Sequence, residues 1–486
     1  MTTNLRIPVV GTAIIATLLG AARLAPPPRV TIDTGTLEGV VDSATKVMVF
    51  RGIPYAAPPV GDLRWKPPQP AQPWRGVRAA SQLGRNCMQH QPYGDIDPFA
   101  AGVSEDCLFL NVWTNSVDNR APRPVMVWIH GGGFFAGFGG EERHNGARLA
   151  QKGAVVVTLN YRLGPFGFFA HPALAAESPH HSAGNYGLLD QIAALQWVKR
   201  NIARFGGDPS RVTIFGESAG GMSVGSLIAS PLAKGLFQRA ILESGTGIGV
   251  GVNRQDVARA ASLKLADTLA VHGTGADAAA QLRAADAQKV LQAALRLANP
   301  ASPQFFPVVD GWVLPHPVDS TVANGAANLV PVIAGSNRDE GDDWMGAPTR
   351  SFARLMSSRG APTYLYIFSR VGEDSVNRQR GAYHSAEITF VFGRPHPLQP
   401  SAGTTPYDST VAEAMSDYWL AFAATGDPNG APAAGKWPRW PKYDPSTDAL
   451  LEIGPQIAAR TMMKRSVYDS LDAVARSRGE LRPATR

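Results

Sequence analysis

Long hydrophobic segments are scarce in this chain of 486 residues. One apolar run stands out, residues 7–22, and its 16 residues are fewer than a membrane-spanning helix normally uses. The run follows Arg6 and ends in small residues before a proline-rich stretch, which is the pattern of a secretory signal peptide. We therefore predict a signal peptide at residues 1–22 and a secreted or periplasmic protein. The alternative is an uncleaved membrane anchor, and no stable membrane span is expected once the signal is removed.

Cysteine is equally rare, with Cys87 and Cys107 alone in the sequence. In a cytosolic enzyme two free thiols would be the ordinary expectation, whereas a disulfide is favoured in an exported protein. Because the N-terminal pattern indicates export, we predict a Cys87–Cys107 bridge. It would close a loop of about 20 residues and stabilise the fold by roughly 3 kcal/mol if the effect is mainly on chain entropy.

The chain also lacks the features of a nucleic-acid-binding protein. Its net charge is +7, but the basic residues are scattered singly, apart from a loose cluster near the end, RSRGELRPATR. No basic stripe or aromatic stacking platform accompanies them, so we expect no nucleic-acid partner. Internal repeats, low-complexity tracts and clear linkers are absent as well. With 44% hydrophobic residues, one large domain at residues 23–486 explains the chain better than several small ones.

What is present is an alternation of buried strands and helices. Continuous apolar runs at residues 124–130 and 154–160 are typical of strands that are covered on both faces. Further strands are expected at residues 212–215, 239–245, 329–335 and 363–369. The pattern predicts an α/β fold with a mostly parallel central sheet flanked by helices. A small antiparallel sheet is expected near the N-terminus, and an alanine-rich helical region at residues 253–299 is expected above the main sheet.

Ser218 lies at the apex of a sharp strand-to-helix turn in RVTIFGESAGGMSV. Gly216 and Gly220 flank it, which gives the G-x-S-x-G pattern of a nucleophile elbow. Such a turn projects the hydroxyl above the sheet edge, where ligands bind in α/β folds. The pattern alone would also fit an ordinary serine in a glycine-rich turn. The strand-turn-helix setting favours a nucleophile, provided that the chain supplies its partners.

A nucleophilic serine needs a general base that is oriented by a carboxylate. In elbow enzymes the chain order is serine, then acid, then histidine. His384 lies in a loop beyond a predicted strand and is the expected base, with His396, between two prolines, as the alternative. Asp339 and Glu340 follow the end of another strand, and Asp310 lies upstream. Spacing divides the choice of acid between Asp339 and Glu340.

The loop WIHGGGFFAGFGG supplies a fourth element, because three glycines follow directly after a predicted strand. No Gly-Lys-Ser/Thr follows them, which excludes a phosphate-binding P-loop. Backbone N–H groups of an HGGG-type loop stabilise a developing oxyanion in elbow enzymes. We expect the N–H groups of Gly132, Gly133 and Ala219 to form a three-donor oxyanion hole. The reaction predicted in this way uses no metal and no cofactor.

Together these motifs resemble the type-B carboxylesterases, over residues of about 30–454. FGGDPSRVTIFGESAGG resembles the serine signature of that family, and SEDCLFLNVW resembles its second signature around a disulfide cysteine. GSNRDEG and YHSAEITFVFG are similar to its acid and histidine motifs, and YWLAFAATGDPN with WPRWPKYD resembles its C-terminal end. The resemblance implies an α/β-hydrolase fold, a Ser218–His384–Glu340 triad and the disulfide. It also implies that Glu217 is a carboxylate near the leaving-group side.

Two features depart from the family pattern. Glu340 and His384 are only 44 positions apart, so helices that usually help to wall the pocket are expected to be missing and the site to be open. The loop between the cysteines contains no Trp, the residue that seats choline in cholinesterases by a cation–π interaction. Its aromatic residues are Tyr93 and Phe99, which disfavours a specialist for choline esters. The loop is also short and charged, unlike a lipase lid.

The predicted function is that of a serine carboxylesterase acting on small-molecule esters through an acyl-enzyme intermediate. A lipase or an amide-cleaving specialist of the same family is the first alternative, and a non-catalytic binding relative is the second. Activity is expected to decline as the pH falls through the usual histidine range of about 6 to 7. The sequence favours no particular oligomeric state.

Overall fold

The computed structural model describes residues 26–90, 101–297, 305–373, 375–394, 405–462 and 464–477. The predicted signal peptide lies outside the described residues, as do Tyr93, Phe99 and His396. Among the helices within these ranges, none combines the length and the apolar character that crossing a membrane requires.

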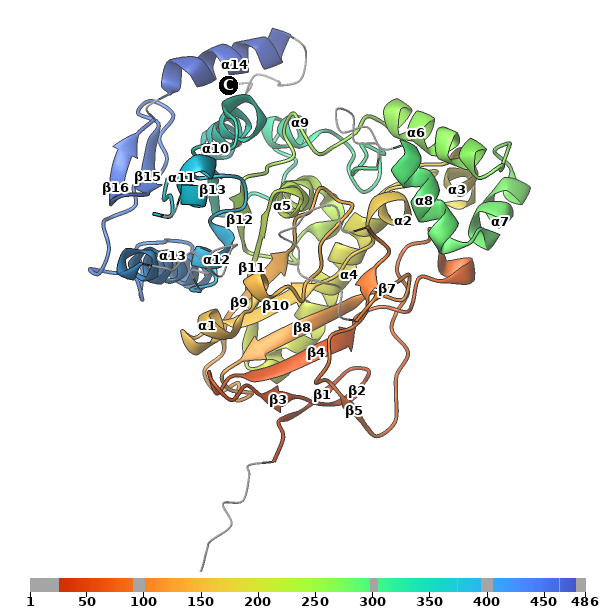
Figure 1. Ribbon diagram of the computed structural model, residues 1–486, viewed down its shortest axis with the longest axis horizontal. Coiled ribbons are helices and arrows are strands. Elements are labelled where there is room, and N and C mark those ends of the chain that lie inside the picture. The colour runs from red at the N-terminus through yellow and green to blue at the C-terminus, as the bar shows by residue number, and fades with distance from the viewer. Residues whose placement is uncertain are drawn as a thin grey trace, which may run out of the picture.

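Within the described residues, a sheet of eleven strands forms the centre of the molecule (Figure 1). The strand order is β16-β15-β14-β13-β12-β11-β9-β10-β8-β4-β3. In this order the strands from β15 to β10 are parallel to one another, and antiparallel strands extend both edges. The strands are β3 (Val40–Val41), β4 (Met48–Pro54), β8 (Phe109–Thr114), β9 (Arg123–Ile129), β10 (Val155–Leu159), β11 (Gly207–Glu217), β12 (Arg239–Glu243), β13 (Val332–Asn337), β14 (Thr363–Phe368), β15 (Ala449–Ile453) and β16 (Ile457–Thr461). The predicted α/β-hydrolase architecture, with its mostly parallel sheet, is confirmed.

The N-terminal strands divide between two sheets. The hairpin of β1 (Arg29–Ile32) and β2 (Gly35–Glu38) forms a small separate sheet, as predicted, with β5 (Val77–Ala79) added in parallel. The next two strands, β3 and β4, instead extend the edge of the main sheet. A further pair, β6 (Asn86–Cys87) and β7 (Val103–Ser104), lies close to the cysteines.

Helices cover both faces of the main sheet because alternate strand residues point to opposite sides. In β9, Val125, Val127 and Ile129 pack in one buried cluster with residues of α4, α5 and α10. Met126 and Trp128 point to the other face and pack in a second cluster with residues of α1, α12 and α13. The helices are α1 (Ala147–Gln151), α2 (Gly164–Gly167), α3 (Pro172–Glu177), α4 (Tyr186–Asn201), α5 (Ala219–Ala229), α6 (Gln255–Thr268), α7 (Ala276–Ala284), α8 (Ala287–Leu297), α9 (Val318–Ala323), α10 (Ala347–Ser358), α11 (Ser375–Arg380), α12 (Ile388–Val391), α13 (Pro406–Thr425) and α14 (Arg465–Ser477).

The alanine-rich region forms a helical lobe beyond one end of the sheet. Helices α6, α7 and α8 gather there with α3, at the right of Figure 1. They share a hydrophobic cluster of their own, in which Trp65, Phe166 and Phe169 pack against small and aliphatic side chains. The predicted helical excursion is therefore confirmed.

The two cysteines form the predicted disulfide, with their Cα atoms 4.9 Å apart. Both are buried, and Cys107 is fully enclosed in the main core two positions before β8. The bridge therefore fixes the start of a core strand to the short β6 segment.

Replacing both cysteines with alanine is expected to lower the free energy of unfolding by about 3 kcal/mol, because the unfolded chain regains the freedom of the opened loop. Thermal unfolding of the wild type and of Cys87→Ala/Cys107→Ala, each with and without a thiol reductant, measures the effect. The reductant should lower the midpoint of the wild type and leave the variant unchanged. Equal midpoints for the wild type and the variant would contradict a stabilising bridge.

Candidate active site

Ser218 forms the turn between β11 and α5 on its own, since the strand ends at Glu217 and the helix begins at Ala219. Its backbone has φ 57° and ψ −122°, in the region of positive φ that few residues other than glycine adopt. The Ser218 N–H donates to the carbonyl of Glu243 at 2.9 Å, and the Ser218 carbonyl accepts from Met222 at 2.8 Å. The turn is therefore the strained elbow that the sequence predicts.

The two glycines of the motif are explained by close backbone approach. A Cβ atom on Gly220 would lie 2.0 Å from the carbonyl oxygen of Ile129, and one on Gly216 would lie 2.5 Å from the same oxygen. Both distances are too short for any side chain. The end of β9 therefore presses against the elbow, which brings the loop after β9 to the nucleophile.

Glu340 and His384 meet although they come from different loops. Glu340 lies in the acid loop, residues 338–346, which follows β13, and His384 lies between α11 and α12. The Nδ1 atom of His384 is 2.7 Å from Oε2 of Glu340, and the backbone N–H of Asn337 donates to Oε1 of Glu340 at 2.7 Å. The side chain of Glu340 is fully buried, and that of His384 is 26% exposed. The carboxylate therefore holds the Nδ1 side of the ring.

Asp339, the neighbour that sequence spacing left as an alternative, points elsewhere. Its Oδ2 atom accepts from the backbone N–H of Ala382 at 2.7 Å and pairs with Arg338 at 2.6 Å. Its own N–H donates to the carbonyl of Ala382 at 3.1 Å. Asp339 therefore ties the acid loop to the loop that carries His384, while Glu340 faces the imidazole.

The second nitrogen of His384 faces the elbow. Its Nε2 atom lies 3.2 Å from Oε1 of Glu217, the residue directly before Ser218. Among the described residues, no hydrogen bond joins His384 to the Ser218 hydroxyl. The proposed base thus contacts the residue next to Ser218 at the same edge of the sheet.

Several carboxyl groups surround the histidine and set its protonation. Burial favours the neutral imidazole and lowers the pKa of His384, but the charges of Glu217 and Glu340 outweigh burial and raise this pKa to about 9. Burial, with the charges of Glu217 and Glu340, raises the pKa of Glu387 to about 8, and burial raises the pKa of Glu243 well above its usual range. Burial thus favours the protonated forms of Glu387 and Glu243.

These two glutamates were missed by sequence reasoning. Glu387 accepts from the Asn337 side chain at 2.5 Å, and Glu243 accepts from the Trp419 indole at 2.7 Å. Glu387 lies within the histidine motif, three positions after His384, which is the signal that could have identified it. Glu243 ends a strand but belongs to none of the quoted motifs.

The glycine loop after β9 lies against the nucleophile. A Cβ atom on Gly131 would be 3.3 Å from Cβ of Ser218. Gly132 and Gly133 have φ of 95° and 62°. Among the described residues, none accepts a hydrogen bond from the N–H of Gly132 or Gly133. The N–H of Ala219 is at the first position of α5, where a helix leaves its donors without internal partners.

His130, which precedes the glycines, is buried and neutral. Burial lowers the pKa of His130 to about 4. Its ring stacks on Tyr161 with the centroids 4.5 Å apart, and the Tyr161 hydroxyl donates to the His130 carbonyl at 2.9 Å. His130 therefore supports the glycine loop from within the core.

Four aromatic residues of the glycine loop and the acid loop differ in their exposure. Phe134 and Phe138 are buried. Phe135 and Trp344 are 39% and 41% exposed, and the ring of Trp344 lies 4.6 Å from the ring of His384. Within the described ranges, no group of three or more His, Cys, Asp or Glu side chains is arranged to hold a metal ion.

Comparison with known proteins gives consistent matches over most of the chain. The profile of the Carboxylesterase family matches residues 26–346 and 341–470. The chain is 36% identical to the fumonisin B1 esterase of Sphingopyxis macrogoltabida, over 88% of this chain and 86% of that protein. It is 35% identical to the para-nitrobenzyl esterase of Bacillus subtilis (strain 168), over 88% and 95%. A solved structure of a Geobacillus stearothermophilus carboxylesterase superimposes with a TM-score of 0.80 at 32% identity, covering 91% of this chain and 99% of that one.

Proposed function

Because this chain belongs to the carboxylesterase family, and is thereby a carboxylic-ester hydrolase, we propose that Ser218, His384 and Glu340 carry out its reaction. Its substrates are small-molecule esters. In the proposed assignment Ser218 is the nucleophile, His384 the general base and Glu340 the carboxylate that orients the imidazole. The observation that carries the assignment is the 2.7 Å contact between Glu340 and Nδ1 of His384, with Nε2 turned toward the elbow.

The first half of the reaction forms an acyl-enzyme. His384 accepts the hydroxyl proton of Ser218 as the serine oxygen attacks the ester carbonyl, which gives a tetrahedral intermediate. The negative charge on its oxygen is stabilised by the N–H groups of Gly132, Gly133 and Ala219. Collapse of the intermediate breaks the bond to the alcohol, which leaves with the proton returned by His384.

The second half releases the acid. His384 removes a proton from a water molecule as the water oxygen attacks the acyl carbon. The same donors stabilise the second tetrahedral intermediate, and Ser218 leaves with the proton from His384. Glu217 lies beside Nε2, where its negative charge stabilises the imidazolium that forms in both halves.

A panel of p-nitrophenyl esters of increasing acyl length, combined with a fluorophosphonate probe, tests this function. Hydrolysis with stoichiometric labelling of Ser218 is the expected result. A protein that takes no label and turns over no ester would contradict the assignment and favour a binding relative. A sharp rise in activity on emulsified long-chain triglycerides would instead identify a lipase.

The dependence of activity on pH follows from the raised pKa of His384. The base must be neutral to accept the serine proton, so kcat/KM should rise with pH and level off above about 9, close to the raised pKa. This rise, the acid limb of the pH profile, lies well above the pH range of 6 to 7 expected from the sequence, because neighbouring carboxylates stabilise the imidazolium. Initial rates between pH 5 and 10, corrected for spontaneous ester hydrolysis, measure it. A limb centred near 6.5 would show that these carboxylates do not act on the base.

We also propose that residues 1–22 direct the chain out of the cytosol and that residues 23–486 form a single domain. The basic and apolar pattern of the N-terminus and the Cys87–Cys107 bridge support export. The continuous sheet from β3 to β16 supports the single domain. Mass spectrometry of the N-terminal peptide of exported protein would test the cleavage.

A further inference from the structure

Helix α14 packs against the elements that immediately follow the catalytic acid. It lies over α10 at the edge of the molecule (Figure 1). It also contacts the π-helical turn Asp342–Gly346, which is the second half of the acid loop and leads directly into α10. A segment more than 120 positions later in the chain thus covers the loop of Glu340.

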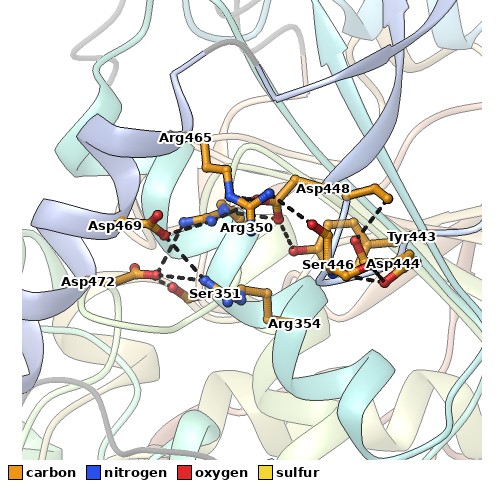
Figure 2. Close-up of polar contacts among 11 residues, drawn as sticks. Arg350, Ser351, Arg354, Tyr443, Asp444, Ser446, Asp448, Arg465, Asp469 and Asp472 are labelled. Atoms are coloured by element: carbon orange, nitrogen blue, oxygen red, sulfur yellow. Dashed lines mark hydrogen bonds and ion pairs between the residues drawn. The ribbon is translucent and has the colours of Figure 1, made fainter.

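The helix is anchored by a buried arginine on α10. Figure 2 shows Arg350 at the centre of the cluster, with Asp469 and Asp472 approaching from α14. Arg350 is fully buried, and its Nη2 atom lies 2.8 Å from both Asp448 and Asp469. Asp472 accepts from the hydroxyl of Ser351 at 2.5 Å. The charge of Arg350 is therefore paired by carboxylates that include two from the helix, which fixes α14 in one place on α10.

A second set of contacts joins the helix to the acid loop. Nζ of Lys464, the residue directly before α14, lies 2.9 and 3.0 Å from the two carboxylate oxygens of Asp342. The Tyr468 hydroxyl donates to the same carboxylate at 3.1 Å, and Tyr468 is only 4% exposed. A Cβ atom on Gly346 would lie 2.3 Å from that hydroxyl. Both ends of the π-helical turn are thus in contact with Tyr468.

The π-helical turn is in turn coupled to the catalytic acid. The N–H groups of Met345 and Gly346 both donate to the carbonyl of Gly341, at 3.1 and 3.3 Å. Gly341 directly follows Glu340 and has φ 105°, so its conformation depends on how the turn is held. A displacement of the turn therefore moves the backbone that carries the Glu340 carboxylate.

The same turn also reaches the catalytic base. Trp344, in the middle of the turn, has its ring 4.6 Å from the ring of His384. The turn thus supports His384 through Trp344 and Glu340 through Gly341. Both contacts depend on one short segment, whose first and last residues, Asp342 and Gly346, are contacted by Tyr468 of α14.

We propose that α14 is a positioning element for the catalytic pair, with Tyr468 and Lys464 as its positioning residues. By holding Asp342 they fix the π-helical turn, which sets the Glu340 carboxylate on Nδ1 of His384 and the Trp344 ring against the imidazole. This proposal rests on the proposed roles of Glu340 and His384. In this proposal neither Tyr468 nor Lys464 takes part in a step of the reaction.

The double variant Tyr468→Phe/Lys464→Met tests the proposal, because it removes both polar contacts to Asp342 and keeps most of the packing. We expect kcat per active site to fall about tenfold, since small displacements of a catalytic group reduce the rate steeply. KM should stay within about twofold, because ground-state binding is not altered. The acid limb of kcat/KM should move to lower pH by roughly half a unit or more, since a looser Glu340 stabilises the imidazolium less.

Asp342→Ala breaks the same link from the other side and should give the same changes. Because the three residues act through one contact, the triple variant should lose little more activity than either variant does.

Lys464→Arg, which keeps a cation, should retain wild-type kinetics. Tyr407→Phe is a matched control, since its hydroxyl bonds the carbonyl of Gly454 instead of the acid loop, and Arg254→Met removes an exposed ion pair with Asp256.

Labelling by a fluorophosphonate probe counts the intact active sites in each preparation, so loss of folded protein does not enter kcat. A double variant with a lower thermal midpoint but wild-type kcat and an unmoved acid limb would overturn the positioning role and leave the proposed function intact. A wild type that neither takes the label nor hydrolyses esters would overturn the proposed function, and the positioning role with it.

Discussion

Ser218→Ala is expected to lower kcat by roughly 10⁴-fold or more, because the hydroxyl is the only group proposed to form the acyl-enzyme. The residual rate should come from the oxyanion donors and from substrate binding alone. Labelling by the fluorophosphonate should be lost at the same time. The measurement is the steady-state rate on the best p-nitrophenyl ester of the panel.

A matched control for this variant is Ser223→Ala, which removes a buried hydroxyl on α5 that accepts from Gln191 at 3.0 Å. This variant should keep its label and most of its activity. If Ser218→Ala, purified free of wild-type enzyme, retained more than a small fraction of wild-type kcat, Ser218 would not be the nucleophile.

Glu340→Gln is expected to lower kcat by about 10³- to 10⁴-fold, the range seen when the orienting carboxylate of a serine triad is removed. Glutamine keeps the shape of the side chain but not the charge, so the imidazolium is no longer stabilised at Nδ1. The acid limb of any remaining activity should move to lower pH, because the charge of Glu340 helps to raise the pKa of His384. Rates across the pH range measure both effects.

The neighbouring variant Asp339→Asn is the natural comparison. It removes the ion pair with Arg338 but leaves an oxygen that can accept from Ala382. Its loss of kcat should stay within about tenfold, since Asp339 does not touch the imidazole. A larger loss of kcat for Asp339→Asn than for Glu340→Gln would show that Glu340 is not the catalytic acid.

Local sequence patterns predicted those parts of the fold and site that are determined locally. The continuous apolar runs identified β9 and β10, and the G-x-S-x-G pattern predicted the strained turn at Ser218, because a buried strand and a strained turn restrict the residues at their own positions. The pairing of the cysteines was predicted from their number and the export signal. Chain order and the motif around His384 then indicated the base.

What local patterns could not predict depends on contacts between distant segments. Spacing could not separate Asp339 from Glu340, because the two carboxylates differ in their contacts with Ala382 and His384, more than 40 positions later. The raised pKa of His384 arises from Glu217 and Glu340, which only the folded sheet brings around one ring. The strands β3 and β4 belong to the main sheet because β4 pairs with β8, a strand more than 50 positions later in the chain.

The elbow has a consequence for efforts to engineer this protein. A serine held at φ 57° carries a conformational penalty of about 1 to 3 kcal/mol that glycine would not. A screen that ranks substitutions at position 218 by thermal resistance alone would therefore favour glycine and discard the nucleophile. At position 218, the residue that gives the highest thermal stability differs from the residue that allows turnover. Selection for stability therefore has to include an assay of activity.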